Sequence, residues 1–228
     1  MTFPQHLRAV LFDMDGVLFN SMPYHAEAWH VVMERHGLHL SREEAYLHEG
    51  RTGAGTINIV YGRQFGKEAS PELIDTIYAE KSQEFSRFPE PAPMPGAWEL
   101  LQQVKEGGLI PVLVTGSGQR TLLDRLNHQF PGIFTPDHMV TAYDVRYGKP
   151  HPEPYLMGLK KAGVTAEEAV VVENAPIGVQ AAVAAGIFTL AVNTGPLDAQ
   201  VLLDAGADRL YPSMQALCAD WQQLLKNN

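Results

Sequence analysis

Residues 7–20 read LRAVLFDMDGVLFN, and this stretch places two aspartates directly after a short apolar run. AVLF, residues 9–12, has the composition of a buried strand. If the backbone stays extended beyond it, Asp13 and Asp15 point to the same side, because strand side chains alternate with a period of two. Two carboxylates that close repel and raise each other's pKa. The pair therefore indicates a site that needs a positive partner.

Four further runs share the apolar, β-branched or Leu-rich composition of residues 9–12: residues 109–114, 169–172, 188–192 and 208–211. Helical patterns separate most of these runs, and some of them end in glycine, as helix C-termini often do. Alternating strands and helices are typical of a doubly wound parallel sheet. The predicted fold class is therefore α/β with a Rossmann-like core.

Residues 20–92 interrupt this alternation, because the segment is too long for one crossover and reads as helices. The Pro-rich stretch PEPAPMPG then marks the return to the sheet. We expect a catalytic core formed by residues 1–19 and 93–228, and an inserted α-helical cap domain between them. The linkers are expected near Phe19–Pro23 and Pro89–Pro95, where movement of the cap would limit access to the site.

The composition argues against several classes of function. The 228 residues are 45% hydrophobic and 19% charged, and no apolar run approaches the roughly 20 residues that a membrane span needs. A formal net charge of −9 opposes nucleic-acid binding, which depends on Lys and Arg. The N-terminal segment lacks the plan of a signal peptide, so we expect a cytoplasmic protein. We also expect a monomer, with the single cysteine, Cys218, as a buried structural thiol.

Polar side chains follow the predicted strands at their carboxyl ends, where open α/β sheets bind ligands. TGSG, residues 115–118, follows the second strand, Glu173 and Asn174 follow the third, and Lys149 lies in a loop before a helix. Hard oxygen ligands suit Mg²⁺, which would relieve the repulsion between the aspartates and screen an anionic substrate. The pattern therefore predicts magnesium-dependent phosphoryl transfer on a small phosphorylated substrate.

Each group has a role in such a reaction. Asp13 would attack phosphorus and form an aspartyl-phosphate, which splits one difficult step into two. Asp15 would protonate the leaving oxygen and then deprotonate the attacking water. The phosphoryl oxygens would be held by a set of donors on neighbouring loops: Thr115, Lys149 and the amides from Gly116 through Ser117 to Gly118. Each piece alone also fits a turn, a helix cap or a solvated lysine, and only their joint placement at strand ends favours catalysis.

Four segments, in chain order, carry a resemblance to a known family: LFDMDGVLFNS, VTGSG, GKPHPEPY and VVVENAPIGVQAAVAAG. They look like the four ordered motifs of the haloacid dehalogenase superfamily, with a helical cap inserted after the first. The pattern DMDGV followed by NSMPYHAEAW resembles the β-phosphoglucomutase-like subgroup. The cap phrase MPYHAEAWH and HEGRTGAGTINIV is similar to that of a bacterial inorganic pyrophosphatase of this subgroup.

The resemblance implies a role for each matching residue. Asp13 would be the nucleophile and Asp15 the acid and base, with Thr115 and Lys149 as phosphate binders and Mg²⁺ as cofactor. The metal would be held by Asp13, by the main-chain carbonyl of Asp15 and by the motif after the third strand, here Glu173 and Asn174. The second aspartate is the one that phosphotransferases of the superfamily have and dehalogenases lack.

Two departures from the family pattern bear on the substrate. The last motif usually supplies two carboxylates, but Asn174 stands at the second position and brings no charge. The cap loop of β-phosphoglucomutase carries a lysine and, four residues later, an arginine that grip the distal phosphate; Glu49 and Gly53 stand at these positions. A carboxylate there would repel a phosphate by on the order of 1 to 4 kcal/mol unless it reaches the metal. We therefore expect Glu49 to complete the metal site when the cap closes.

A cap that lies so close to the metal leaves little room beyond the first phosphate, which favours a small leaving group such as a second phosphate. Arg51 is the expected partner of that second phosphate. His25, one turn inside the first cap helix, is expected to bind near the substrate and to contact Asp15 or Glu49. Lys81 lies in a charged helix and is a weaker candidate for a functional role, which the sequence leaves open. A set of residues at helical spacing is expected to pack the cap: Trp29, His30, Val32 and Met33.

The leading hypothesis is a phosphohydrolase that prefers pyrophosphate and accepts small phosphate esters. The alternative enzyme is β-phosphoglucomutase, against which the loss of the Lys and Arg pair argues. A catalytically idle binding module is the alternative of another class, and the intact Asp13, Asp15, Thr115 and Lys149 argue against it.

Overall fold

A six-stranded parallel sheet lies at the centre of the structure, a computed structural model that describes residues 1–118 and 122–226. Its strands follow the spatial order β3-β2-β1-β4-β5-β6. Leu11 in the central strand pairs with Val112 on one side and with Val171 on the other. The strands of the described residues are β1 (Ala9–Phe12), β2 (Ile110–Val114), β3 (Met139–Val140), β4 (Ala169–Glu173), β5 (Phe188–Val192) and β6 (Arg209–Tyr211).

The predicted α/β class with a Rossmann-like core and a helical cap is confirmed, and the five predicted strands agree with β1, β2, β4, β5 and β6 to within one residue at each end. The sequence prediction missed β3, because two residues, Met139 and Val140, are too few to show a periodic pattern. Strand β3 matters nevertheless, since the Thr115 N–H donates to the Val140 carbonyl at 2.9 Å and so fixes the start of the TGSG loop.

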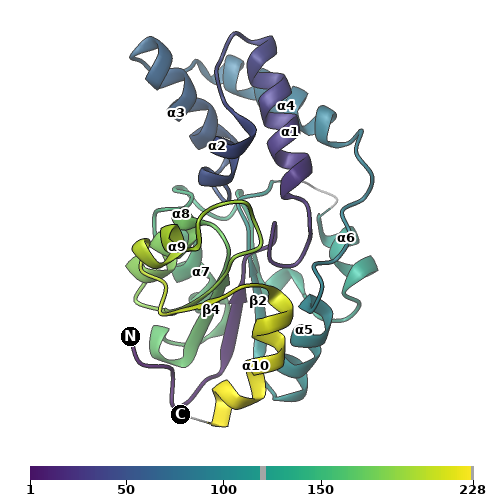
Figure 1. Ribbon diagram of the computed structural model, residues 1–228, viewed down its shortest axis with the longest axis vertical. Coiled ribbons are helices and arrows are strands. Elements are labelled where there is room, and N and C mark those ends of the chain that lie inside the picture. The colour runs from purple at the N-terminus through teal and green to yellow at the C-terminus, as the bar shows by residue number, and fades with distance from the viewer. Residues whose placement is uncertain (119–121, 227–228) are drawn as a thin grey trace.

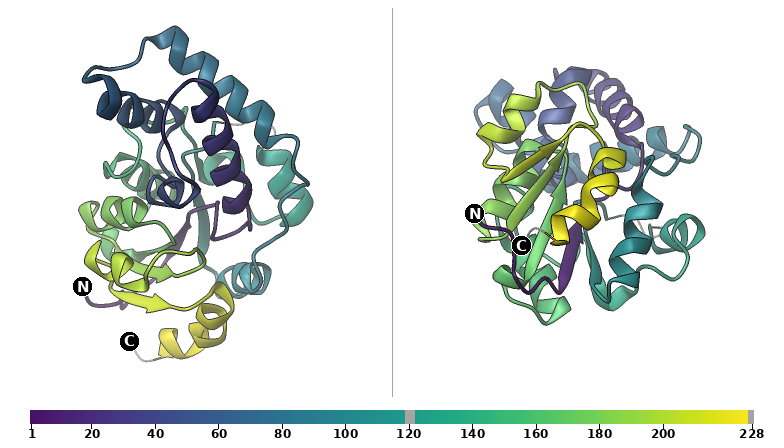
Figure 2. Two further views of the ribbon diagram at one scale, coloured as in Figure 1. Left: turned by 45° about the horizontal axis from the view of Figure 1, so that its top comes forward. Right: turned by 60° about the horizontal axis from the view of Figure 1, so that its bottom comes forward.

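Helices cover both faces of the sheet (Figure 2). Val10 and Phe12 of β1 pack toward α5, α6 and α10, whereas Ala9 and Leu11 pack toward α7 and α8. This alternation explains why AVLF is apolar throughout, since both faces are buried. The core helices are α5 (Ala97–Glu106), α6 (Leu122–Gln129), α7 (Glu153–Ala162), α8 (Pro176–Ala184), α9 (Ala199–Asp204) and α10 (Met214–Lys226), with short 3₁₀ turns η1 (Pro136–His138) and η2 (Ala166–Glu168).

A separate helical layer, the cap, lies beyond one end of the sheet (Figure 1). It consists of α1 (Met22–Arg35), α2 (Arg42–Leu47), α3 (Gly53–Phe65) and α4 (Pro71–Phe85). The side chains of Ser41, Thr52 and Ser70 cap α2, α3 and α4 by accepting a first-turn amide hydrogen. The cap has its own apolar cluster, which includes Val32, Met33, Ile57, Val60 and Ile77. As expected, Val32 and Met33 pack inside it.

The two segments that join cap and core lie side by side. The Asn20 N–H donates to the Ala92 carbonyl at 2.9 Å, and the Met94 N–H donates to the Leu18 carbonyl at 2.8 Å. These bonds tie the two connections together at the level of the sheet. The domain boundaries at residues 19/20 and 92/93 stay a prediction.

The structure also bears on two other predictions, which concern membrane spans and the burial of Cys218. None of the helices in the described part of the chain is long and apolar enough to span a membrane. Cys218 is half-buried rather than buried, because it lies at the margin of α10 against Gln103, whose side-chain amide donates to its sulfur at 3.3 Å.

Candidate active site

The loop after β1 carries both aspartates, and they contact different groups. Asp13 is buried, and its N–H donates to the Val172 carbonyl of β4 at 3.0 Å. Gly16 has a φ of +79°, and a Cβ there would lie 2.0 Å from Asn174 Nδ2. Only glycine therefore lets this loop turn back so close to the end of β4.

Lys149 joins Asp13 to Glu173 in the buried part of the site. Its Nζ lies 2.5 Å from Asp13 Oδ1 and 2.7 Å from Glu173 Oε1, and it also donates to the Val114 carbonyl at 3.1 Å. Burial, together with the charges of Glu173 and Asp15, outweighs the attraction of Lys149 and raises the pKa of Asp13 to about 8. Burial opposes the charge of Lys149, but the two carboxylates prevail and raise its pKa. One ammonium thus faces an excess of buried carboxylates.

All the hydrogen bonds of Glu173 hold protein groups in place. Oε1 accepts from Lys149 and, at 2.8 Å, from the hydroxyl of Tyr155; Oε2 accepts the backbone N–H groups of Asn174 and Ala175 at 2.9 and 3.0 Å. A Cβ at Gly178 would lie 1.7 Å from Glu173 Oε1, so a glycine in α8 makes room for this carboxylate. The geometry makes Glu173 the residue that positions Lys149. Sequence reasoning missed Tyr155, although it ends the GKPHPEPY segment.

Glu49 reaches the core from the cap. Its Oε1 accepts a hydrogen bond from Asn174 Nδ2 at 2.8 Å, while Asn174 Oδ1 is buried and has no hydrogen-bond partner. Glu49 is 6% exposed, and burial, with the charges of Asp13, Glu173 and Asp15, raises its pKa well above the usual range. The structure thus brings together the two positions at which the sequence departs from the family pattern.

The donors around Asn174 match the preferences of a hard cation. They include the unpartnered amide oxygen of Asn174 and the carboxylates of Glu49 and Asp13, next to the loop that carries Asp15. Among the residues that the structure describes, no group of three or more His, Cys, Asp or Glu side chains is already arranged as a metal site. The fit to Mg²⁺ therefore depends on one amide oxygen together with carboxylate oxygens.

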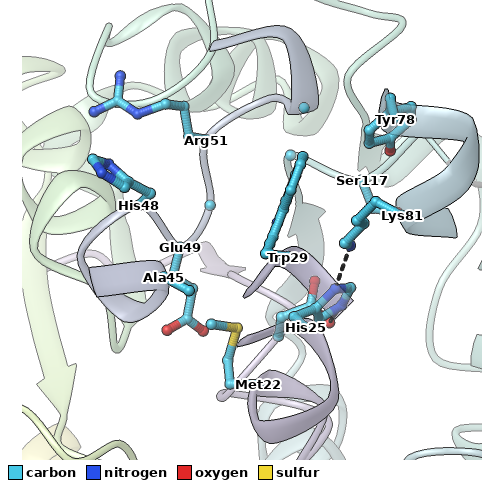
Figure 3. A pocket seen from close by; sticks show the side chains of 14 residues that line it. Met22, His25, Trp29, Ala45, His48, Glu49, Arg51, Tyr78, Lys81 and Ser117 are labelled. Atoms are coloured by element: carbon cyan, nitrogen blue, oxygen red, sulfur yellow. Dashed lines mark hydrogen bonds and ion pairs between the residues drawn. The ribbon is translucent and has the colours of Figure 1, made fainter. Parts of the chain in front are cut away.

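Asp15 belongs to a second chain of contacts, which leads into the cap and includes the contact between Lys81 and His25 drawn in Figure 3. Its Oδ1 accepts from the Ser21 hydroxyl at 2.5 Å and contacts His25 Nε2 at 3.2 Å; Lys81 Nζ lies 2.6 Å from His25 Nδ1. Burial alone would raise the pKa of Asp15, but His25 and Ser21 lower it to about 2. Ser21 is the N-cap residue of α1, yet its side chain makes no capping bond and serves Asp15 instead.

Lys81, whose role the sequence left open, is buried. It is 5% exposed, it stands 5.2 Å from the ring centroid of Trp29, and burial lowers its pKa to about 8. The sequence held a signal for this, because Ile77, Lys81 and Phe85 recur every four residues and form the buried side of α4. Of the two partners expected for His25, the structure shows Asp15.

Thr115 and the glycine after it bring the core loop against the cap. Thr115 is buried, and its Oγ1 accepts the Ser117 N–H at 3.0 Å. A Cβ at Gly116 would lie 2.5 Å from the Gly50 carbonyl oxygen. The cap loop that carries Glu49 therefore packs directly on the loop that would bind phosphate.

The catalytic cavity is the space enclosed between cap and core beside these groups, with a volume of about 60 Å³ (Figure 3). Asp15, His25, Glu49, Lys81 and Ser117 are among the residues that line it. Since a cavity needs roughly 10–15 Å³ of such volume to hold a water molecule, this cavity has room for a group of phosphate size.

Arg51 lines the catalytic cavity as expected, but its position differs from that of the other cation. Figure 3 shows its guanidinium beside His48, across the cavity from Lys81. Arg51 Nε is buried without a hydrogen-bond partner, and burial lowers the pKa of the guanidinium. Lys81, which sequence reasoning set aside, is the cation next to His25 and Asp15.

Comparisons with known proteins agree on one family. A family model for haloacid dehalogenase-like hydrolases matches residues 7–186. Hexitol phosphatase A of Escherichia coli is 33% identical over 82% of this chain and 83% of its own length. A phosphorylated carbohydrates phosphatase of Thermotoga maritima is 34% identical over 92% of this chain and 97% of its own. A solved structure from Bacteroides vulgatus, provisionally named β-phosphoglucomutase, is 60% identical with a TM-score of 0.95, and the match covers 98% of this chain and 90% of that one.

Proposed function

The chain belongs to the haloacid dehalogenase-like hydrolase family, and from this premise we propose that it is a magnesium-dependent phosphohydrolase whose preferred substrate is inorganic pyrophosphate. The observation that carries the substrate is the small catalytic cavity, about 60 Å³, which is lined by the carboxylate-bearing Glu49 that also bonds to Asn174. A second phosphate fits such a space, whereas a sugar is far larger. The names of the relatives, which are sugar and polyol phosphatases, support hydrolysis of small phosphorylated compounds in general.

The reaction would proceed in two steps at Asp13. A carboxylate oxygen of Asp13 attacks phosphorus, an aspartyl-phosphate forms, and the bond to the bridging oxygen breaks to release phosphate. Water then attacks the aspartyl-phosphate and gives up a proton to Asp15, which releases the second phosphate. His25 and Ser21 hold Asp15 in its ionised form, which suits this base role. A departing phosphate needs less protonation than an alkoxide, since its second pKa is about 6.

The remaining groups hold the transferring phosphoryl group. Lys149, positioned by Glu173, Tyr155 and the Val114 carbonyl, would bind a phosphoryl oxygen beside Asp13. The Thr115 hydroxyl and the amides of the TGSG loop would bind the others, where charge accumulates in the transition state.

Mg²⁺ would be held by Asp13, the carbonyl of Asp15, Asn174 Oδ1 and Glu49. The unpartnered oxygen of Asn174 and the excess of buried carboxylates support this set. When bound, the ion neutralises charge on the phosphoryl oxygens. Glu173, which the resemblance placed among the ligands, is instead assigned to holding Lys149, because its oxygens already accept four hydrogen bonds.

The alternative is a phosphoglucomutase, as the provisional name of the Bacteroides vulgatus structure suggests for that protein. A mutase has to hold a sugar with two phosphates. The size of the catalytic cavity and the carboxylate of Glu49 inside it oppose that substrate.

Steady-state kinetics with Mg²⁺ test the proposal on pyrophosphate, sorbitol 6-phosphate and β-glucose 1-phosphate. We expect kcat/KM for pyrophosphate to exceed the others at least tenfold, and Asp13→Asn to abolish turnover. Glu49→Ala should raise the Mg²⁺ concentration for half-maximal rate at least tenfold, whereas Glu44→Ala, which removes a cap glutamate paired with Arg63, should leave it unchanged. Preference for a sugar ester would refute the proposed substrate, and an unchanged Mg²⁺ requirement in Glu49→Ala would refute its role as a ligand.

A further inference from the structure

A second cavity, the rear cavity, lies behind the catalytic one. Its volume is about 240 Å³, and its lining includes Gly16, Tyr46, Met94, Asn174 and Thr194. These residues come from the loop after β1, from α2, from the return linker and from the loops after β4 and β5. The rear cavity takes no part in the mechanism described above.

The two cavities share a wall. Asp15 lines the catalytic cavity and its neighbour Gly16 the rear one; Ala45 and Tyr46 divide in the same way. In each of these two segments, one residue lines the catalytic cavity and the next residue lines the rear cavity. Met22 lines both cavities.

Met22 fills the wall with its side chain. It is the first residue of α1, it is 6% exposed, and Figure 3 shows its side chain extending toward Glu49. A thioether is flexible and apolar, so it fills an irregular gap without requiring a hydrogen bond. A leaving group that extended from the catalytic cavity into the rear one would meet this side chain, because Met22 lines both.

We propose that Met22 determines substrate specificity by excluding leaving groups larger than a phosphate. This inference rests on the proposed function, and it identifies Met22 as the residue that limits the size of the leaving group. Removing the end of this side chain joins the two cavities into one that accommodates the polyol or sugar part of a phosphate monoester. Specificity of this kind comes from a steric barrier against the wrong substrate rather than from contacts with the right one.

Met22→Ala tests the proposal with three substrates of increasing size: pyrophosphate, glycerol 1-phosphate and sorbitol 6-phosphate. We expect the ratio of kcat/KM for sorbitol 6-phosphate to that for pyrophosphate to rise at least tenfold, and the rise for glycerol 1-phosphate to be smaller. The inhibition constant of sorbitol 6-phosphate against pyrophosphate hydrolysis should fall by a similar factor. Met22→Val, which shortens the side chain less, provides a second measurement if the alanine variant is poorly folded, as judged by its melting temperature.

Met94→Ala is the matched control, because Met94 lines the rear cavity alone and the same truncation enlarges that cavity without opening the wall. Its substrate ratio should equal that of the wild type. Folded Met22→Ala and Met22→Val with the wild-type ratio, or an equal change in Met94→Ala, would overturn the role of Met22. Failure of the proposed function shows separately, as a wild-type enzyme that does not prefer pyrophosphate.

Discussion

Lys81 sits where a lysine is normally excluded, on the buried side of a cap helix. Its ammonium contacts His25 Nδ1 at 2.6 Å and faces the rings of Trp29 and Phe85, each 5.2 Å away. Through His25 it is linked to Asp15, so a charge held inside the cap would support the proposed acid and base of the core. Burying such a group costs free energy, which indicates that it is retained for the reaction rather than for stability.

Lys81 predicts a pH dependence of stability. Burial lowers its pKa to about 8 from 10.5, so between these values the unfolded chain binds more protons than the folded one. Stability should therefore rise with pH across this window, and the full penalty should be present below pH 8. At about 1.4 kcal/mol per pKa unit, the effect is on the order of 3 kcal/mol.

Urea unfolding of the wild type and of Lys81→Met from pH 7 to 11 measures this effect. Lys81→Met should be the more stable protein at pH 7, and its advantage should shrink as the pH rises. Lys67→Met, which alters an exposed cap lysine, should follow the wild type at every pH. A constant difference between wild type and Lys81→Met would contradict the prediction.

At the scale of elements, the loop between α2 and α3 controls the fit of cap to core. It carries Glu49 to Asn174, and its backbone packs on glycines of two core loops. A Cβ at Gly116 would lie 2.5 Å from the Gly50 carbonyl oxygen, and one at Gly148 would lie 2.6 Å from Thr52 Cγ2. Because these two core residues have no side chain, the cap loop can lie directly against the backbone of the core loops.

Gly116→Ala should therefore prevent full closure of the cap. The added methyl meets backbone, which cannot move aside cheaply, so the Glu49 carboxylate is held away from Asn174. We expect kcat/KM for pyrophosphate to fall about a hundredfold, in line with the effect of misplacing catalytic groups by about 1 Å. Because the clash is with the cap loop and not within the sheet, the melting temperature should change little.

Gly62→Ala is the control for this variant. Gly62 lies inside α3, and an added Cβ would come no closer than 3.8 Å to any atom outside its own turn. Alanine should stabilise the helix by up to about 1 kcal/mol and leave kcat/KM unchanged. Equal activities of Gly116→Ala and the wild type would show that close approach at this glycine is not required.

At the scale of the whole molecule, cap and core are joined by two paired connections. The bonds from Asn20 to Ala92 and from Met94 to Leu18 hold the connections together where they leave the sheet. A hinge between cap and core must therefore bend on the cap side of these bonds. In the proposed mechanism the core would provide the nucleophile, Lys149 and the phosphate loop, and the cap would add Glu49, His25 and Lys81, so the site would be complete only when the two parts meet.

Hydrogen exchange with and without Mg²⁺ and orthovanadate, a phosphate analogue, measures this closure. Amides of residues 48–53 and 116–118 should gain protection when both are added, because these loops pack against each other in the closed form. The amides of Asn20 and Met94 should exchange at the same rate in both conditions. Unchanged exchange at 48–53, or faster exchange at Asn20, would contradict this description of the hinge.

The sequence by itself determined the sheet and the edge where the chemistry collects. Short apolar runs flanked by helical patterns specify parallel strands, and the carboxyl ends of parallel strands meet at one edge. Asp13, Asp15, Thr115 and Glu173 follow from that rule alone, since each stands at or just after the end of a strand. Lys149 was recognised from its place in a loop before a helix, and family resemblance was needed for the position of Glu49.

Only the tertiary structure decided what each of these groups does. Glu173 bonds to Lys149 and Tyr155, Lys81 is buried against His25, and Met22 lines two cavities. Each of these facts depends on contacts between segments far apart in the chain. A local pattern records the period of an element but not which partner meets its buried face, so the packing of cap on core has to be known before these roles can be assigned.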